Sequence, residues 1–143
     1  MNHHELVDSY FLACSGGTAE EIAGHFCGDA VVYDLNHEPV RGAAGIGDFY
    51  VRVRDRWGGA TWLVDTYLGD EQHAAGEWSM HGTADGTPFV VRGSEHYEFE
   101  AGKIAQIRQY WKFDPSRPGV ALRGYPYAQD GRFSAAETSA DAS

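Results

Sequence analysis

Alternating apolar and polar residues dominate the second half of the chain. Between residues 77 and 114, two turn signals, Asp85-Gly86 and Ala101-Gly102, separate three runs rich in aromatic and β-branched residues. Asp-Gly readily accepts the positive φ angles of a two-residue turn, and a period of two residues is typical of strands. The pattern therefore predicts a three-strand antiparallel meander, around which the rest of the chain is organised.

Two-residue turns would fix the register of this meander. Met80 is then predicted to lie opposite Val91 in the first hairpin, and Glu95 opposite Arg108 in the second. One face is expected to present Trp78, Met80, Phe89, Val91, Glu95, Tyr97, Phe99, Arg108, Tyr110 and Lys112, and the other His81, Val90, Arg92, His96, Ile107, Trp111 and Phe113.

Both predicted faces are too apolar to be open to water. A sheet covered on both sides needs helices on one face and something else on the other, and we expect a second subunit there, giving a homodimer. A bulge at Gly93 or near Tyr110-Trp111 would exchange the two faces, so the assignment of side chains to a face stays open at this stage.

Helical and strand periodicities alternate in the first half of the chain. Apolar spacing predicts a helix at residues 5–14, a capping box at Thr18 and Glu21 starts a second short helix, and the clearest helix covers residues 43–57. Strands are predicted at residues 30–35 and 61–68. This order favours an α+β fold with three N-terminal helices gathered on one side of a curved sheet.

The composition fits one globular domain. The chain has 143 residues, 43% of them hydrophobic and 13% aromatic, enough for one substantial core. We place the domain at residues 1–114 and a Pro- and Gly-rich C-terminal extension at 115–143, whose last ten residues are expected to be disordered. Tyr125, Tyr127 and Phe133 are expected to fold back over the body or onto a partner.

Charge and motifs exclude several classes of function. With 11 basic and 21 acidic residues and a formal charge of -10, the chain should repel nucleic acids and anionic membranes. No bilayer-spanning run or basic leader is present, so a cytoplasmic protein is expected. Cys14 and Cys27 lack metal or redox spacing, and no glycine loop for a nucleotide exists. We therefore expect reduced thiols, no metal and no cofactor.

The element order and several motifs resemble the nuclear transport factor 2-like superfamily, within it the SnoaL-like polyketide cyclases and ketosteroid isomerases. The motifs are the Asp34 strand followed by Pro-Val-Arg-Gly and a long helix, and the runs at 78–86 and 99–104. The resemblance implies a cone-shaped sheet with the helices on its concave side. Its likeness to ketosteroid isomerase implies Asp34 as general base, Tyr10 as oxyanion-hole tyrosine, and Glu95 in place of a protonated aspartate.

Each candidate catalytic residue also has a structural interpretation. Asp34 could cap the turn at residues 36–38, Glu95 could pair with Arg108 across the strands, and Tyr10 could be an ordinary core aromatic. The expected substrate-binding residues are Trp62, Trp78, Met80, His81, His96, Tyr97, Tyr110, Trp111 and Lys112.

Two functions are consistent with these residues. The first is a cofactor-independent isomerase, cyclase or dehydratase that acts by general acid-base catalysis on a small hydrophobic carbonyl compound resembling a polyketide or steroid. The second is a non-catalytic binding or dimerisation module of the same fold. Lys112 stands where epoxide hydrolases of this fold should have an acidic residue, which argues against that activity.

Overall fold

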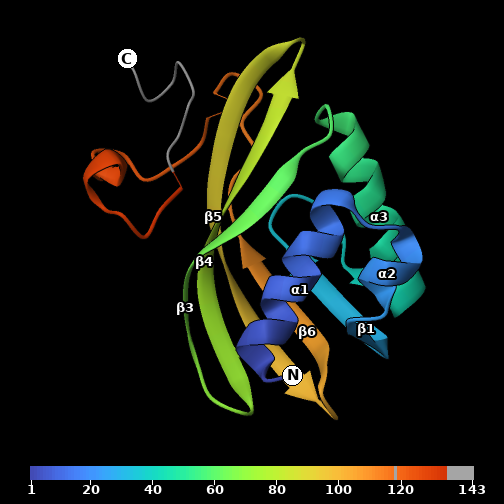
Figure 1. Cartoon of the computed structure of the whole chain (residues 1–143). Helices are drawn as coiled ribbons and strands as arrows, with labels where there is room; N and C mark the ends of the chain where they lie inside the picture. Colours follow the sequence, from blue (N-terminus) through green and yellow to red (C-terminus); the bar gives the residue numbers. More distant parts are fainter. Residues whose placement is uncertain (118, 135–143) are drawn as a thin grey trace.

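Three helices lie on one face of a curved, open sheet (Figure 1). The computed structural model describes residues 1–117 and 119–134. In chain order the elements are α1 (His3–Gly16), α2 (Ala19–Ala23), β1 (Phe26–Asp34), β2 (Val40–Arg41), α3 (Ala43–Arg56), β3 (Thr61–Gly69), β4 (His73–Ala84), β5 (Thr87–Glu100), β6 (Lys103–Tyr110) and a 3-10 turn (Tyr127–Gln129). The predicted α+β class is confirmed.

The sheet has the strand order β2-β1-β6-β5-β4-β3. Strands β3 to β6 form the antiparallel meander, whereas β1 pairs with β6 in parallel. The parallel pair puts the end of β1 beside the end of β6, with Asp34 opposite Gln109. Side chains of the first strand and of the meander therefore meet at one end of the concave face.

Helices α2 and α3 begin where the sequence predicts, and α1 begins two residues earlier, at His3. The side chain of Asn2 caps α1, and Thr18 and Glu21 form the predicted capping box of α2. Helix α2 ends at Ala23, and β1 begins at Phe26, four residues before the strand predicted at residues 30–35. No helix in the described ranges is long and apolar enough to cross a membrane.

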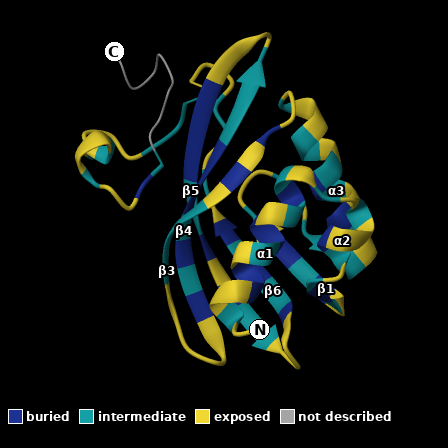
Figure 2. Cartoon of the chain, in the orientation of Figure 1, coloured by how far each residue is buried: buried dark blue, intermediate teal, exposed yellow. Residues whose placement is uncertain are grey.

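Helix α3 packs its apolar stripe against the concave face, as predicted. Ile46 and Tyr50 are buried, and Phe49 and Trp57 are half-buried where the helix borders a cavity. The buried residues concentrate between the helices and the sheet (Figure 2). Burial of this stripe is the apolar driving force that holds α3 over the sheet.

The first hairpin register is confirmed and the second is wrong. Met80 does lie opposite Val91. Glu95, however, lies opposite Gln109, because the β5–β6 register shifts between Glu98 and Phe99 and moves Arg108 opposite His96. One extra residue on one strand exchanges the faces beyond it.

This shift changes which side chains of β6 reach the concave face. Ile107 is buried in the core, and Trp111 and Phe113 line a cavity under α3, although the alternation placed all three on the opposite face. Conversely, Arg108 donates to Glu98 at 3.1 Å on the convex face, and Tyr110 is half exposed. The predicted pairing of Glu95 with Arg108 is therefore absent.

The C-terminal extension lies against the convex face of the sheet (Figure 1). The guanidinium of Arg92 stacks 4.2 Å from the ring centre of Tyr127, and Phe133 is buried beside it. Ser134 bonds to side chains of β3 and β4. Part of the face on which we expect a second subunit is thus covered by the chain itself, and the homodimer stays a prediction. Of the ten residues expected to be disordered, 135–143 lie outside the described residues.

Candidate active site

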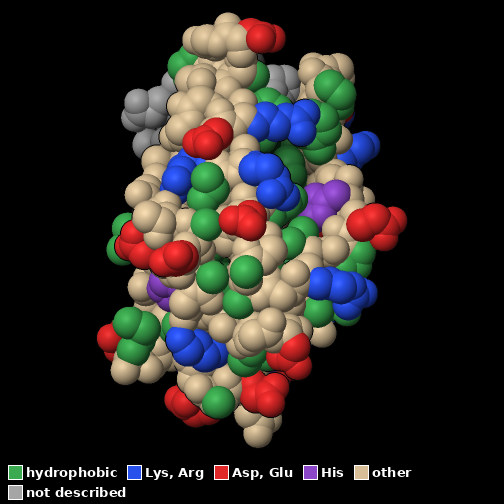
Figure 3. Space-filling view, turned by 90° about the vertical axis from the view of Figure 1, so that its right-hand side faces the viewer, with side chains coloured by type: hydrophobic (Ala, Val, Ile, Leu, Met, Phe, Trp, Pro, Cys, Tyr) green, Lys and Arg blue, Asp and Glu red, His purple; other side chains and the backbone are tan. Residues whose placement is uncertain are grey.

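A cavity of about 260 Å³ opens between α3 and the concave face of the sheet. Its walls are mostly aromatic and include all four tryptophans of the chain, Trp57, Trp62, Trp78 and Trp111. On the helix-bearing surface, a hollow lined by hydrophobic side chains lies beside basic side chains and a histidine (Figure 3). This combination of an apolar enclosure with a few polar groups is typical of small-molecule sites.

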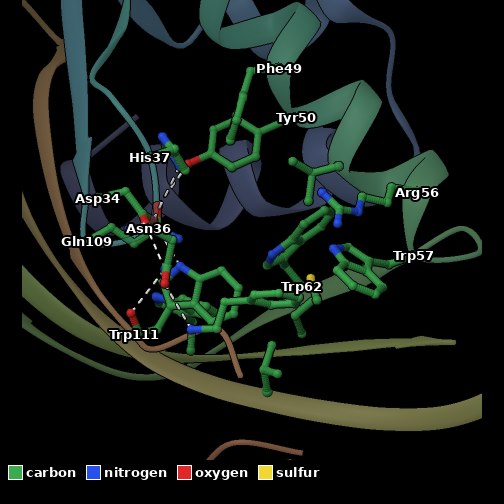
Figure 4. Close-up of a pocket in the computed structure, with 15 residues that line it drawn as sticks. Asp34, Asn36, His37, Phe49, Tyr50, Arg56, Trp57, Trp62, Gln109 and Trp111 are labelled. Carbon is green, nitrogen blue, oxygen red and sulfur yellow. Dashed lines mark hydrogen bonds and ion pairs between the residues drawn. The ribbon is translucent and has the colours of Figure 1, made fainter. Parts of the chain in front are cut away.

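Asp34 lies in the wall of this cavity at the end of β1 (Figure 4). Its side chain is only 2% exposed. Oδ1 accepts hydrogen bonds from the backbone N–H and the side-chain amide of Asn36, at 2.7 and 2.8 Å, and Oδ2 accepts one from Nε1 of Trp111 at 2.9 Å. Oδ1 thus holds the following turn, as the structural interpretation expected. Oδ2 instead bonds to Trp111, which also lines the cavity.

His37 is the other titratable group at Asp34. Its Nε2 lies 3.6 Å from Asp34 Oδ2, and its Nδ1 lies 2.8 Å from the carbonyl oxygen of Glu38. A carbonyl oxygen only accepts, so Nδ1 must be protonated and donate. Nε2 therefore has a proton to offer Asp34 only when the ring is an imidazolium, and otherwise it can accept one. His37 is 29% exposed and so connects Asp34 to solvent.

Glu95 lies two strands from Asp34 in the same row of the sheet. Gln109 is the register partner of both residues, opposite Asp34 on β1 and opposite Glu95 on β5. With neighbouring strands about 4.8 Å apart, the two carboxyl-bearing positions are about 10 Å apart. The sequence interpretation placed the oppositely charged Arg108 beside Glu95, and the neutral Gln109 stands there instead.

The surroundings of Glu95 favour its neutral form. The residue is 3% exposed, and its Oε2 has no hydrogen-bond partner among residues 1–117 and 119–134. Burial raises the pKa of Glu95 to about 8; the Tyr97 hydroxyl opposes this rise, and the charge of Asp34 adds to it. At pH 7 Glu95 is consequently a protonated acid, whereas a partner such as Arg108 would have kept it ionised.

Tyr50, not Tyr10, presents a hydroxyl to the cavity. Tyr50 lines the cavity and donates to Oε1 of Gln109 at 3.2 Å, on the side where Asp34 lies (Figure 4). Tyr10 is buried behind it, with ring centres 5.8 Å apart. Burial raises the pKa of both tyrosines, and the hydrogen bond between their hydroxyls raises that of Tyr10 and lowers that of Tyr50. Their interaction therefore favours Tyr50 as the stronger donor of the two.

The structure brings together some of the predicted site residues and separates others. Asp34, Trp62, Trp78, Met80 and Trp111 line the main cavity, and Tyr10 and Glu95 border a much smaller one directly behind Tyr50 and Trp62. The remaining predicted residues lie elsewhere: Tyr97 is in the core, His81 and His96 are on the convex face, and Tyr110 and Lys112 border a second cavity beneath the C-terminal extension.

Sequence reasoning missed several polar groups of the cavity. His37 and Asn36 follow Asp34 directly in a loop, Gln109 is hidden by the register shift, and Tyr50 and Arg56 lie on the helix α3. Tyr50 belongs to the apolar stripe of its helix and is not among the predicted site residues. A hydroxyl at the centre of such a stripe is a signal that could have identified it, because buried tyrosines need a hydrogen-bond partner.

Comparisons with known proteins agree with this architecture. A family model described as SnoaL-like domain matches residues 7–107, and no curated protein matches the chain. A protein of Catenulispora acidiphila with a ketosteroid isomerase-like fold, crystallised with trimethylamine, is 18% identical, with a TM-score of 0.69 over 78% of this chain and 87% of that one.

Two further solved structures show the same fold. A proposed polyketide cyclase of Pseudomonas putida is 21% identical, with a TM-score of 0.68 over 85% of this chain and 99% of that one. TerC, co-crystallised with polyporic acid, is 14% identical, with a TM-score of 0.67 over 76% and 90%. The chain therefore belongs to the SnoaL-like domain family, in the nuclear transport factor 2-like superfamily.

Proposed function

We propose that the protein is a cofactor-independent isomerase, cyclase or dehydratase that moves a proton next to the carbonyl group of a small hydrophobic compound. The observation that supports this proposal best is Asp34, a nearly buried carboxylate in the wall of an aromatic cavity. A carboxylate in such a place can take a proton from a bound carbon acid, because little water competes for it.

The groups near Asp34 can stabilise the negative charge that this proton transfer produces. Removing a proton next to a carbonyl leaves negative charge on the carbonyl oxygen, which a preorganised donor must stabilise. Tyr50 is that donor in our proposal: its hydroxyl now bonds to Gln109, and a substrate oxygen could accept from it instead. Tyr10 supports it from behind, and the protonated Glu95 adds no opposing charge.

His37 gives the proton a route away from Asp34. Its Nε2 is within 3.6 Å of Asp34 Oδ2 and its ring is partly exposed. A proton taken by Asp34 can return to the substrate at another carbon, as an isomerisation requires, or leave through His37. Two solved structures of the same fold support the substrate class, since one is a proposed polyketide cyclase and the other was crystallised with polyporic acid.

The proposal can be tested without knowing the natural substrate. 2-Tetralone in deuterium oxide serves as a probe, and exchange of its α-protons is followed by NMR. The protein should accelerate exchange, and Asp34→Asn, which removes the basic lone pair, should reduce that acceleration by about 10²- to 10⁴-fold. Asp29→Asn, at an exposed position of the same strand, is the matched control and should leave exchange unchanged.

Two outcomes would contradict the proposal. Full exchange by Asp34→Asn would exclude Asp34 as the base. Binding of 2-tetralone without any accelerated exchange by the unmodified protein would instead support the non-catalytic binding module.

A further inference from the structure

The cavity has a positive end as well as a negative one. Arg56, at the C-terminal end of α3, lines the cavity, and its side chain extends toward the interior from the side opposite Asp34 (Figure 4). The formal charge of the whole chain is -10, so the general field of the protein does not favour anions. A cation in the cavity wall is therefore a local feature.

The other arginines of this helix are placed differently. Arg54 donates from Nη1 to the carbonyl oxygens of Cys14 and Gly17, at 3.0 and 2.9 Å, and so ties α3 to the end of α1. Arg52 and Arg56 are both exposed residues, but of the two only Arg56 lines the cavity. Arg56 makes no hydrogen bond or ion pair with residues 1–117 or 119–134; its recorded contacts are with aromatic rings.

Those aromatic contacts fix the guanidinium at the cavity. It lies 5.0 Å from the ring centre of Trp57 and 6.0 Å from that of Phe113, and both rings line the same cavity. A guanidinium that stacks through its flat face keeps its N–H groups available at its edge, in the fork that matches a carboxylate. Trp57 and Phe113 thus hold the guanidinium of Arg56 at the cavity, and its N–H groups remain available to bind an anion.

The remaining walls restrict where an anionic group can lie. A carboxylate near Asp34 would be repelled by it, and the tryptophans between the two ends offer mainly apolar contact. The volume of 260 Å³ is slightly below the range of about 300–1,000 Å³ usual for ligand pockets. The cavity therefore suits a flat compound of one or two rings better than a four-ring steroid.

We propose that the substrate is a small planar acid whose carboxylate, or an equally acidic oxygen, binds Arg56 while its reacting carbon faces Asp34. This inference rests on the proposed function for the role of Asp34, and it adds the class and the orientation of the substrate. Arg56 is in this view a specificity-determining residue that does not take part in the proton transfer.

The test uses a matched pair of probes, 2-naphthoate and its neutral isostere 2-naphthamide. Their binding is measured from the NMR signals of the tryptophan indole N–H groups. Trp57 and Trp62 border the main cavity and not the second one, so their shifts identify the site. The unmodified protein should bind the naphthoate more tightly than the amide, by at least about threefold for a partly solvated ion pair.

Arg56→Gln should remove this preference by weakening the acid alone. Arg52→Gln, one turn earlier on the same helix, should leave both affinities unchanged. The inference is overturned if neither probe shifts the Trp57 and Trp62 signals at millimolar concentration, if the amide binds as well as the acid, or if Arg56→Gln weakens both probes equally. None of these readouts involves turnover, so they are distinguishable from a failure of the Asp34 exchange test.

Discussion

Asp65 on the convex face of the sheet and Glu95 on the concave face are both buried carboxylic acids, and they have different surroundings. Asp65, on the convex side, is 2% exposed and lies 3.9 Å from Arg92; its Oδ1 accepts from the backbone N–H of Ser134 at 3.0 Å and from Ser79 at 3.3 Å. Glu95, on the concave side, has no cation beside it in the described part of the chain. One carboxyl oxygen of each acid, Oδ2 of Asp65 and Oε2 of Glu95, lacks a hydrogen-bond partner in the described structure.

The pKa values reflect this contrast. Burial raises the pKa of Asp65, but the hydrogen bonds from Ser134 and Ser79 and the charge of Arg92 oppose the rise. Burial raises that of Glu95 to about 8, with only Tyr97 opposing. The convex acid thus has a cation and two hydrogen-bond donors of the chain beside it, whereas Glu95 has no cation beside it among the described residues. Burial of an acid alone therefore does not identify a site.

The largest expected effect concerns the pH dependence contributed by Glu95. Its native pKa of about 8 exceeds the ordinary value of 4.5, so between these values the native state binds more protons than the unfolded state, and its stability falls as the pH rises. Glu95→Gln removes this dependence. At about 1.4 kcal/mol per pH unit, the unmodified protein should lose about 4 kcal/mol relative to the variant between pH 4.5 and 8.

Urea denaturation at several pH values measures this difference. Glu98→Gln, which changes a half-exposed acid of the same strand, is the control for general charge effects. Parallel stability curves for Glu95→Gln and the unmodified protein would show that Glu95 is ionised in the native state, and would remove the contrast with Asp65.

A somewhat smaller effect is expected from Asp65→Asn. The change leaves Arg92, whose side chain is 5% exposed, without its charged partner. Breaking a buried pair in this way should cost about 3 kcal/mol of unfolding free energy. Exchange of 2-tetralone should be retained at a temperature where the variant is folded. Loss of exchange in a folded variant would mean that the two faces are functionally coupled.

The smallest expected effect is that of Ser134→Ala. The hydroxyl of Ser134 bonds to Ser79 at 2.7 Å and to His81 at 3.0 Å, while its backbone N–H bonds to Asp65. Only the hydroxyl contacts are lost, so the cost should be about 1 kcal/mol. Protease cleavage of the extension should become faster, with unchanged binding in the main cavity. An unchanged cleavage rate would show that the hydroxyl does not hold the extension.

Local patterns were sufficient to predict most elements of the fold. The Asp85-Gly86 turn fixes the first hairpin, with φ of 52° and 78° at the two residues, and the stripe on α3 predicts its packing on the sheet. The site was harder to predict from the sequence, because it depends on a register shift between β5 and β6 at Glu98 and Phe99. The alternation of apolar and polar residues does not show this shift. That single shift replaces Arg108 by Gln109 beside Glu95 and brings Trp111 to Asp34.

The place where the C-terminal extension docks could also not be predicted from local sequence patterns. The aromatic residues at 125–133 indicated that it folds back, yet the surface that receives it is made by Asp65, Ser79, His81 and Arg92 from three different strands. A pattern along the chain does not show which polar side chains converge across strands. Tyr50 was missed for a similar reason, since its partners Tyr10 and Gln109 come from distant segments.

The parallel pairing of β1 with β6 has a consequence for the order of folding. The meander joins neighbours in the sequence, whereas the contact of Asp34 with the row containing Gln109 and Glu95 closes a loop of about 75 residues. Contacts of such long range form late and slow the folding reaction. We therefore expect any 2-tetralone exchange activity of a refolding sample to recover after most of its β-sheet circular dichroism signal, because the meander can assemble before Asp34 reaches its place.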